Sequence, residues 1–262
     1  MPVLAVLLLL AAIQQIVAPP LLFSGDFDGQ FAGPQRDTPS RPAGYAFAIW
    51  GVIYAGCLAF ALLQLTARWR GHPLVARIRL PAMALFLGST LWLAFARLGP
   101  SWATVPVIWA MLALALACVL PLARAPALPR TLKLAVGWPL ALYAGWLTAA
   151  AFVNSATILP AWGTGTAGLG VEGLGVLMVA GAAGLGLVIL AATRGALPYA
   201  LAVGWALVGI ILANRAPGGS AAVLWTAAGS LVLLLVALAV IRRRRRLLPA
   251  QPVPAPQAAR PA

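Results

Sequence analysis

Eight long apolar runs, separated by short segments that hold most of the charge, constrain the fold of this 262-residue chain more than any other feature. A helix needs about 20 mainly apolar residues to cross a membrane. The expected spans are 3–23, 44–67, 80–98, 102–122, 134–159, 173–193, 196–214 and 221–241. With 63% hydrophobic and 8% charged residues, the chain lacks the charge that covers the surface of a soluble domain. The sequence therefore predicts an all-α, polytopic membrane helix bundle of about eight transmembrane helices.

The location of the charge predicts how the helices are oriented. The net charge is +14, and five of the eighteen basic residues are Arg242–Arg246, directly after the last apolar run. Basic segments such as 68–79 and 124–133 alternate with segments poor in basic residues, such as 160–172. Because cytoplasmic loops of membrane proteins are enriched in Lys and Arg, we expect both termini in the cytoplasm, in a bacterial inner membrane. The same distribution argues against nucleic-acid binding, which the net charge alone would suggest.

Several classes of site lack the residues that they need. Cys57 and Cys118 are isolated in apolar runs and His72 is the only histidine, so we expect neither a disulfide framework nor a metal site. The chain offers no Ser-His-Asp or paired-carboxylate arrangement, and we expect no catalytic residue and no required cofactor. Two GxGxxG patterns within 163–173 follow no predicted strand, which a dinucleotide site requires. No span holds Asp, Glu, Lys or His at mid-depth, which weakens the transporter hypothesis without excluding a facilitator.

The two ends of the chain and its small residues carry further expectations. The first run lacks a positive n-region, so it is interpreted as a retained helix rather than a signal peptide. Residues 247–262, rich in Pro and Ala, are expected to form a disordered cytoplasmic tail. The arginines at 242–246 stop the last span and can also bind anionic membrane lipid. Small-residue pairs such as Ala180 with Gly184 and Ala182 with Gly186 favour close helix packing, with a homodimer face as the alternative.

The fifth run contains a polar stripe that bears on function. Tyr143, Trp146, Ala150 and Asn154 return to nearly the same face of a helix, since each residue advances about 100°. An uncharged amide and two aromatic rings with polar tips on one face of a membrane span favour a partner helix or a bound molecule over lipid. Asn154 is therefore expected either to orient a ligand or to hydrogen-bond a neighbouring helix.

Two other tryptophans lie several residues inside a span and have aromatic or polar company at helical spacing. Trp50 is followed by Tyr54 and preceded by Phe47, and Trp92 lies between Ser89 and Phe95. Buried tryptophan can simply fill volume, with its N–H bonded to a neighbouring helix. Three such clusters in separate spans make an aromatic-lined pocket the more informative hypothesis.

These three clusters resemble the TspO/MBR family of tryptophan-rich sensory proteins, which includes the mitochondrial translocator protein. Segment 42–54, PAGYAFAIWGVIY, is similar to the start of the family's second helix; STLWLAF at 89–95 is similar to its third, and YAGWLTAAAFVN at 143–154 to its fifth. The order and span placement also match. Ser89 stands where the family has asparagine, and the family's long tryptophan-rich first loop is missing, with Phe27, Phe31 and Tyr45 as the only aromatic residues there.

The resemblance implies a divergent member, with a TspO-like five-helix bundle at 1–160 and an additional three-helix membrane segment at 161–246. It also implies binding of a flat hydrophobic ligand, porphyrin- or sterol-like, so a tetrapyrrole is the expected bound molecule. The expected ligand-binding residues are Trp50, Tyr54, Ser89, Trp92, Phe95, Tyr143, Trp146, Ala150 and Asn154. The alternatives are a permease or facilitator for a small hydrophobic molecule, in which the last three helices complete a pathway, and an enzyme acting on porphyrins.

Overall fold

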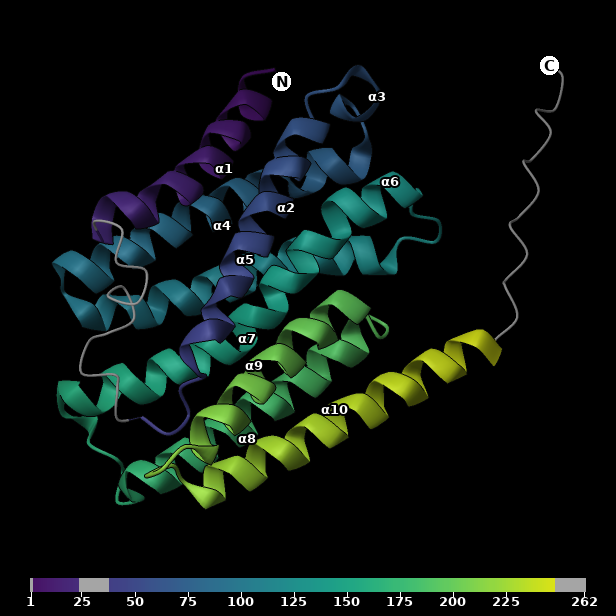
Figure 1. Cartoon of the computed structure of the whole chain (residues 1–262). Helices are drawn as coiled ribbons and strands as arrows, with labels where there is room; N and C mark the ends of the chain where they lie inside the picture. Colours follow the sequence, from purple (N-terminus) through teal and green to yellow (C-terminus); the bar gives the residue numbers. More distant parts are fainter. Residues whose placement is uncertain (1, 24–37, 248–262) are drawn as a thin grey trace, which may run out of the picture.

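The structure is a computed structural model that describes residues 2–23 and 38–247, and regular structure in these ranges is helical (Figure 1). The longer helices are α1 (Pro2–Phe23), α2 (Ile49–Leu63), α4 (Pro73–Leu98), α5 (Thr104–Arg124), α7 (Trp138–Leu159), α8 (Gly170–Ala192), α9 (Leu197–Arg215) and α10 (Ala221–Leu247). Short helical segments connect them: η3 (Gly44–Ala48), α3 (Ala67–Arg70), η4 (Ser101–Ala103), α6 (Arg130–Leu132), η5 (Lys133–Gly137) and η6 (Pro160–Thr164). Phe27, Phe31 and the tail from residue 248 lie outside the described residues.

Eight helices in the described ranges are long and apolar enough to cross a membrane, which confirms the predicted all-α membrane bundle. Several boundaries differ from expectation, and the last helix runs through the arginines to Leu247 rather than ending at residue 241. The second span ends at Leu63 rather than residue 67, and a turn separates it from α3. The third span begins at Pro73 rather than residue 80, because proline at the first turn of a helix loses no hydrogen bond and starts the helix there.

Arg79 was expected in a loop, and the structure corrects this. It lies in the second turn of α4, only 3% exposed. Its Nε donates to Gln64 Oε1 at 2.9 Å, and its Nη2 donates to the carbonyl of Arg70 at 3.0 Å. Gln64 Nε2 in turn donates to the carbonyl of Ala5 at 2.7 Å. A buried guanidinium that finds these acceptors joins α1, α2 and α4 near one end of the bundle.

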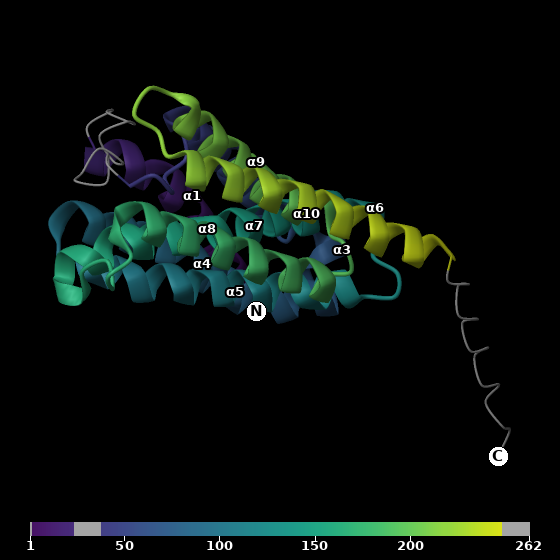
Figure 2. The ribbon, with the colours of Figure 1, turned by 90° about the horizontal axis from the view of Figure 1, so that it is seen from below.

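Helix α7 forms the centre of the bundle. Of the eight spans it is the most buried, at 67%, whereas α10 is the least buried, at 17%. α7 packs against α2 and α5 on one side and against α8 and α9 on the other, while α10 packs mainly against α8 and α9. Figure 1 shows α10 at the edge of the bundle, with α9 between it and α7, and in Figure 2 α10 lies in front of its neighbours. One hydrophobic core runs through all eight spans.

Glycines allow the closest helix approaches. A Cβ on Gly145 of α7 would lie 2.9 Å from Ala202 Cβ and would also meet the carbonyl oxygen of Tyr199, both on α9. On α8, Ala182 and Gly186 are buried, and Gly186 faces Val203 of α9. α9 therefore packs closely on both α7 and α8, through small residues as membrane helices commonly do.

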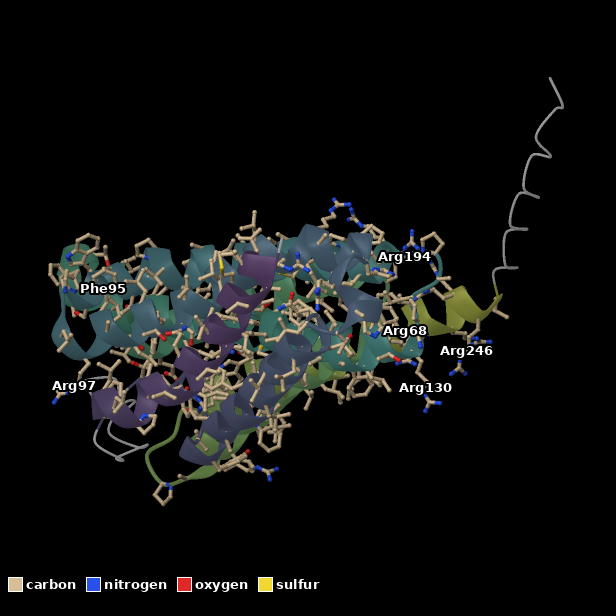
Figure 3. The ribbon with its side chains drawn as sticks, turned by 90° about the horizontal axis from the view of Figure 1, so that it is seen from above. Arg68, Phe95, Arg97, Arg130, Arg194 and Arg246 are labelled. Atoms are coloured by element: carbon tan, nitrogen blue, oxygen red, sulfur yellow. The ribbon has the colours of Figure 1, made fainter. Side chains whose placement is uncertain are left out.

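Most of the described basic residues lie at one end of the bundle. Figure 3 shows Arg68, Arg130, Arg194 and Arg246 together at that end, with Arg97 at the opposite one. The eight spans also bring the start of α1 and the end of α10 to this same end (Figure 1). The asymmetry predicted from the charges of the connecting segments is therefore a property of the folded chain.

Candidate functional site

An aromatic cavity, which we call the tryptophan pocket, opens among α1, α2, α4, α5 and α7. Its volume is about 70 Å³, room for several water molecules. The lining residues come from the first five spans and the segment that precedes the second: Pro19, Arg41, Pro42, Phe47, Trp50, Tyr54, Ser89, Trp92, Leu93, Ile108, Met111, Trp146, Leu147, Ala149, Ala150, Val153 and Asn154.

Trp50 is the hub of the aromatic side chains. Its ring centroid lies 5.3 Å from that of Tyr54, 5.5 Å from that of Tyr143 and 6.1 Å from that of Trp146. The Phe47 ring packs edge-to-face on Trp146 at 5.6 Å. Phe47, Trp50 and Tyr54 share a face at the start of α2 because they are spaced by three and four residues. Edge-to-face pairs of this kind each contribute roughly 0.5–1.5 kcal/mol beyond area burial, so the aromatic wall is a packed structure rather than a loose lining.

The polar groups around the pocket are largely occupied by neighbouring helices. The Tyr54 hydroxyl and Ser89 Oγ are hydrogen-bonded at 2.8 Å and join α2 to α4. Asn154 Nδ2 donates to Thr104 Oγ1 at 3.1 Å and joins α7 to α5. Of the two roles expected for Asn154, the structure shows the bond to a neighbouring helix, although its side chain also lines the pocket.

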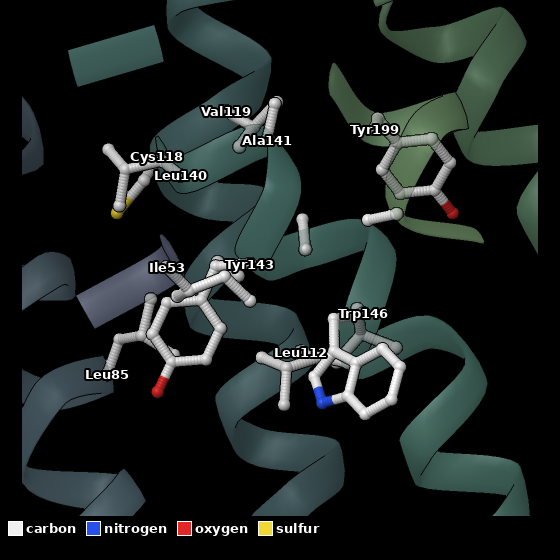
Figure 4. Packing of buried hydrophobic residues seen from close by; sticks show 14 of the residues in the cluster. Ile53, Leu85, Leu112, Cys118, Val119, Leu140, Ala141, Tyr143, Trp146 and Tyr199 are labelled. Carbon is white, nitrogen blue, oxygen red and sulfur yellow. The ribbon is translucent and has the colours of Figure 1, made fainter. Parts of the chain in front are cut away.

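Two pocket tryptophans are different. The indole N–H groups of Trp92 and Trp146 are buried and find no acceptor in the described part of the chain. The Tyr143 hydroxyl is also buried and has no hydrogen-bond partner in the described part of the chain. Figure 4 shows Tyr143 and Trp146 among buried apolar side chains that include Ile53, Leu85 and Leu112. A buried donor without a partner costs about 1–3 kcal/mol. Two side chains that line the pocket therefore carry unpaired N–H donors.

The structure brings seven of the nine predicted residues to one cavity: Trp50, Tyr54, Ser89, Trp92, Trp146, Ala150 and Asn154. Tyr143 lies behind Trp50, fully buried, and is not part of the lining. Phe95 is half-buried and lies near Arg97 at the end of α4 (Figure 3). Six residues after Ser89, it has turned about 120° around the helix, whereas Leu93, four residues after Ser89, has turned only about 40° and lines the pocket.

Sequence reasoning missed the segment that precedes α2. Arg41 and Pro42 line the pocket, and the Arg41 guanidinium lies 5.8 Å from the Phe47 ring centroid. Among the described residues of the lining, Arg41 is the only charged one. One feature of the sequence indicated that this segment could line the pocket: it lies directly before the cluster of Phe47, Trp50 and Tyr54. An arginine in a loop next to a span, however, more often serves to orient the span in the membrane.

Helix α9 holds this segment in place. Ala43 N–H donates to the carbonyl of Gly209 at 3.0 Å, and Trp205 Nε1 donates to the carbonyl of Ala46 at 2.8 Å. Asn214 Nδ2 donates to the carbonyl of Pro39 at 2.7 Å. α9, the seventh of the eight spans, thus anchors one wall of a pocket that is lined by the first five spans and the segment before α2.

The described lining of the tryptophan pocket is suited to binding an apolar molecule. The described residues of this lining include no carboxylate, histidine or cysteine. Elsewhere in the described ranges, no group of three His, Cys, Asp or Glu side chains could hold a metal ion, and Glu172 hydrogen-bonds Ser220 Oγ at 2.6 Å on the surface. The glycine-rich segment 163–173 is largely exposed and runs from the end of η6 into the first turn of α8, rather than forming a phosphate loop after a strand.

A polytopic helical membrane protein with an internal tryptophan-lined pocket is the class that this fold and site define. A family model described as TSPO-like protein matches residues 3–241, all eight spans, and the chain belongs to this family. The family membership inferred from the three aromatic clusters is confirmed, and the match continues through the three helices that follow them. Neither a curated protein nor a solved structure matches the chain.

Proposed function

We propose that this TSPO-like membrane protein binds a flat, hydrophobic ligand, porphyrin- or sterol-like, in the tryptophan pocket. The observation that carries the proposal is the pair of buried indole N–H groups, on Trp92 and Trp146, that find no acceptor in the described chain and lie in the wall of an otherwise apolar cavity. A ligand with an oxygen or nitrogen acceptor would satisfy these donors, and its faces would stack on the aromatic rings.

The aromatic walls of the pocket favour a ligand with a flat ring system. Arg41, beside Phe47, adds a guanidinium to the described lining at one side of the pocket. Tetrapyrroles combine a flat apolar ring system with carboxylate side chains, and this combination fits the pocket chemistry better than a sterol. A tetrapyrrole is therefore the preferred ligand class.

The small volume of the pocket implies that binding moves side chains. Pockets for drug-sized ligands measure roughly 300–1,000 Å³, far more than the 70 Å³ present. Phe47, Trp50 and Met111 are the large lining side chains whose displacement would open the space between α2, α5 and α7. Such a rearrangement would couple ligand binding to helix positions, which is what a sensory role requires.

The test is a titration of the detergent-solubilised full chain with protoporphyrin IX, followed by quenching of intrinsic tryptophan fluorescence. Trp146→Phe keeps a ring but removes the N–H and should weaken binding about fivefold, the value of one ordinary hydrogen bond. Trp225→Phe is the matched control, because Trp225 is 73% exposed on α10. Unchanged affinity in Trp146→Phe, together with a marked drop in melting temperature, would show that the residue is core filler.

The permease hypothesis makes a different prediction. Saturable protoporphyrin IX quenching without flux into proteoliposomes supports binding, whereas flux that Trp146→Phe slows would favour a facilitator. A porphyrin-consuming enzyme would instead show loss of the Soret absorbance of the ligand with time. Each of the three outcomes is distinct.

We further propose that the protein lies in a bacterial inner membrane with both termini in the cytoplasm. The support is the gathering of basic residues at the end of the bundle where α1 starts and α10 finishes (Figure 3). Basic residues are retained on the cytoplasmic side of such membranes. The tryptophan pocket, lined by Pro19 near the end of α1 and by Arg41, would then open toward the opposite face.

A further inference from the structure

We propose that a second cavity, at the arginine-rich end of the bundle, binds the headgroup of an anionic glycerophospholipid. This basic cavity has a volume of about 490 Å³ and lies between the end of α5, the start of α7, the turn from α8 to α9, and the end of α10. Its cationic lining residues are Lys133, Arg242, Arg245 and Arg246. It shares no lining residue with the tryptophan pocket.

Helix geometry selects which arginines face the cavity. Arg242, Arg245 and Arg246 are spaced by three and four residues and therefore share one face of α10. Arg243 and Arg244, between them in sequence, are exposed and not part of the lining. Arg245 Nη1 donates to the carbonyl of Arg194 at 3.0 Å, which fixes the end of α10 against the turn between α8 and α9.

The cavity concentrates positive charge without a compensating acid. None of its lining residues is acidic, and Glu172, the one acid in the described ranges, hydrogen-bonds Ser220 at the other end of α10. Four cations around one space repel one another, and an anion placed among them converts that repulsion into attraction. The α9 N-terminus adds to the positive potential, because Ala196 and Leu197 line the same cavity.

The apolar part of the lining identifies the anion as a lipid rather than free phosphate. The lining also includes Leu128, Trp138 and Leu197, which are partly exposed apolar residues that a hydrated anion would not cover. Arg242 follows directly on the apolar run of α10, so the cations lie where lipid phosphates lie. The outer face of α10 is exposed, with Val236 at 54% and Val240 at 45%, and offers a path for acyl chains. Basic pockets between membrane helices bind lipid headgroups in this way.

The experiment measures binding of dioleoyl phosphatidylglycerol to the detergent-solubilised full chain by native mass spectrometry. Arg242→Gln/Arg246→Gln removes two lining charges and should weaken binding about ten- to thirtyfold. Arg243→Gln/Arg244→Gln removes the same charge from the non-lining face and should change affinity less than about threefold. Equal losses in the two variants would indicate a diffuse basic tail and overturn the proposal, as would no loss in either.

A second pair of variants and two other ligands keep the test decisive if substitutions in α10 destabilise the protein. Lys133→Gln should weaken phosphatidylglycerol binding severalfold, whereas Arg130→Gln, exposed and outside the lining, should not. Dioleoyl phosphatidylcholine should bind at least about tenfold more weakly than phosphatidylglycerol, and its equal binding would overturn the proposal. If glycerol 3-phosphate, which has no acyl chains, competes at the same concentration as the lipid, the site takes a soluble anion and the lipid assignment is wrong.

Discussion

The contact between α7 and α9 through Gly145 makes a sharp prediction. Substituting alanine adds one methyl group, which would lie 2.9 Å from Ala202 Cβ and closer still to the carbonyl oxygen of Tyr199. Neither neighbour can rotate away, since one is backbone and the other is a Cβ atom, so the helices must separate. Overpacking of this kind costs typically 1–3 kcal/mol, and the gain from alanine's helix propensity is only about 1 kcal/mol. A clash with a backbone atom belongs in the upper half of the overpacking range, so we expect a net loss of roughly 1–2 kcal/mol for Gly145→Ala.

The assay is thermal unfolding in a mild detergent, followed by circular dichroism and by the loss of the monodisperse gel-filtration peak. A loss of this size should lower the melting temperature by about 2–8 °C for a chain of this length. Gly51→Ala is the matched control, because a Cβ at Gly51 of α2 meets nothing within 4 Å and should be neutral or slightly stabilising. If the Gly145→Ala variant, like Gly51→Ala, has a melting temperature at or above that of the wild type, the close packing of α7 on α9 is contradicted.

Three further outcomes are expected. Arg79→Met should destabilise by about 1–3 kcal/mol, because it leaves the Gln64 acceptor buried without its donor, whereas the exposed Arg77→Met should stay within about 0.5 kcal/mol in the same unfolding assay. A double-mutant cycle of Asn154→Leu and Thr104→Val should give a coupling of about 0.6 kcal/mol, the average for hydrogen bonds between membrane helices; zero coupling would contradict the bond. A reporter that works only in the cytoplasm should be silent when fused after residue 165 and active at the end of α10, and the reverse pattern would invert the proposed orientation.

The number and order of the spans could be predicted from the sequence, because a helix that crosses the lipid bilayer needs about 20 mainly apolar residues. Each expected run contains or overlaps one observed span, and the run at 196–214, whose start is crowded by Arg194 and Pro198, is α9, 61% buried. What the rule could not give was the true start of α4. As a charged residue between two apolar runs, Arg79 was predicted to lie in a loop. Its burial is favourable only because Gln64, at the end of α2, accepts a hydrogen bond from it in the folded chain.

The pocket was predictable where helical periodicity governs and not where the tertiary fold does. Trp50, Trp92 and Trp146 converge because each lies on an inward face of its own span. Phe95 was predicted because it follows Ser89 and Trp92 at three-residue spacing. Two steps of three residues, however, turn the side chain about 120° away from Ser89 around the helix, so Phe95 lies on another face. Arg41 and Met111 were not predictable, since nothing local to either residue indicates which helix it will meet. The unpaired indole donors could not be foreseen, because satisfaction of a donor depends on every neighbour at once.

The three C-terminal helices contribute to the pocket without lining it. α7 presents Trp146 to the cavity on one face, and on another its Thr148 Oγ1 is hydrogen-bonded to the Tyr199 hydroxyl of α9 at 2.9 Å. α9 also binds the segment before α2 through Trp205 and Gly209, next to Phe47. A ligand that separates α2 from α7 must therefore strain the contacts of α9 with α7 and the contacts of α9 with the segment before α2. Because α9 packs on α10, whose end carries the arginines of the basic cavity, this chain of packed helices connects the two sites, and a change at the tryptophan pocket has a physical route to the opposite membrane surface.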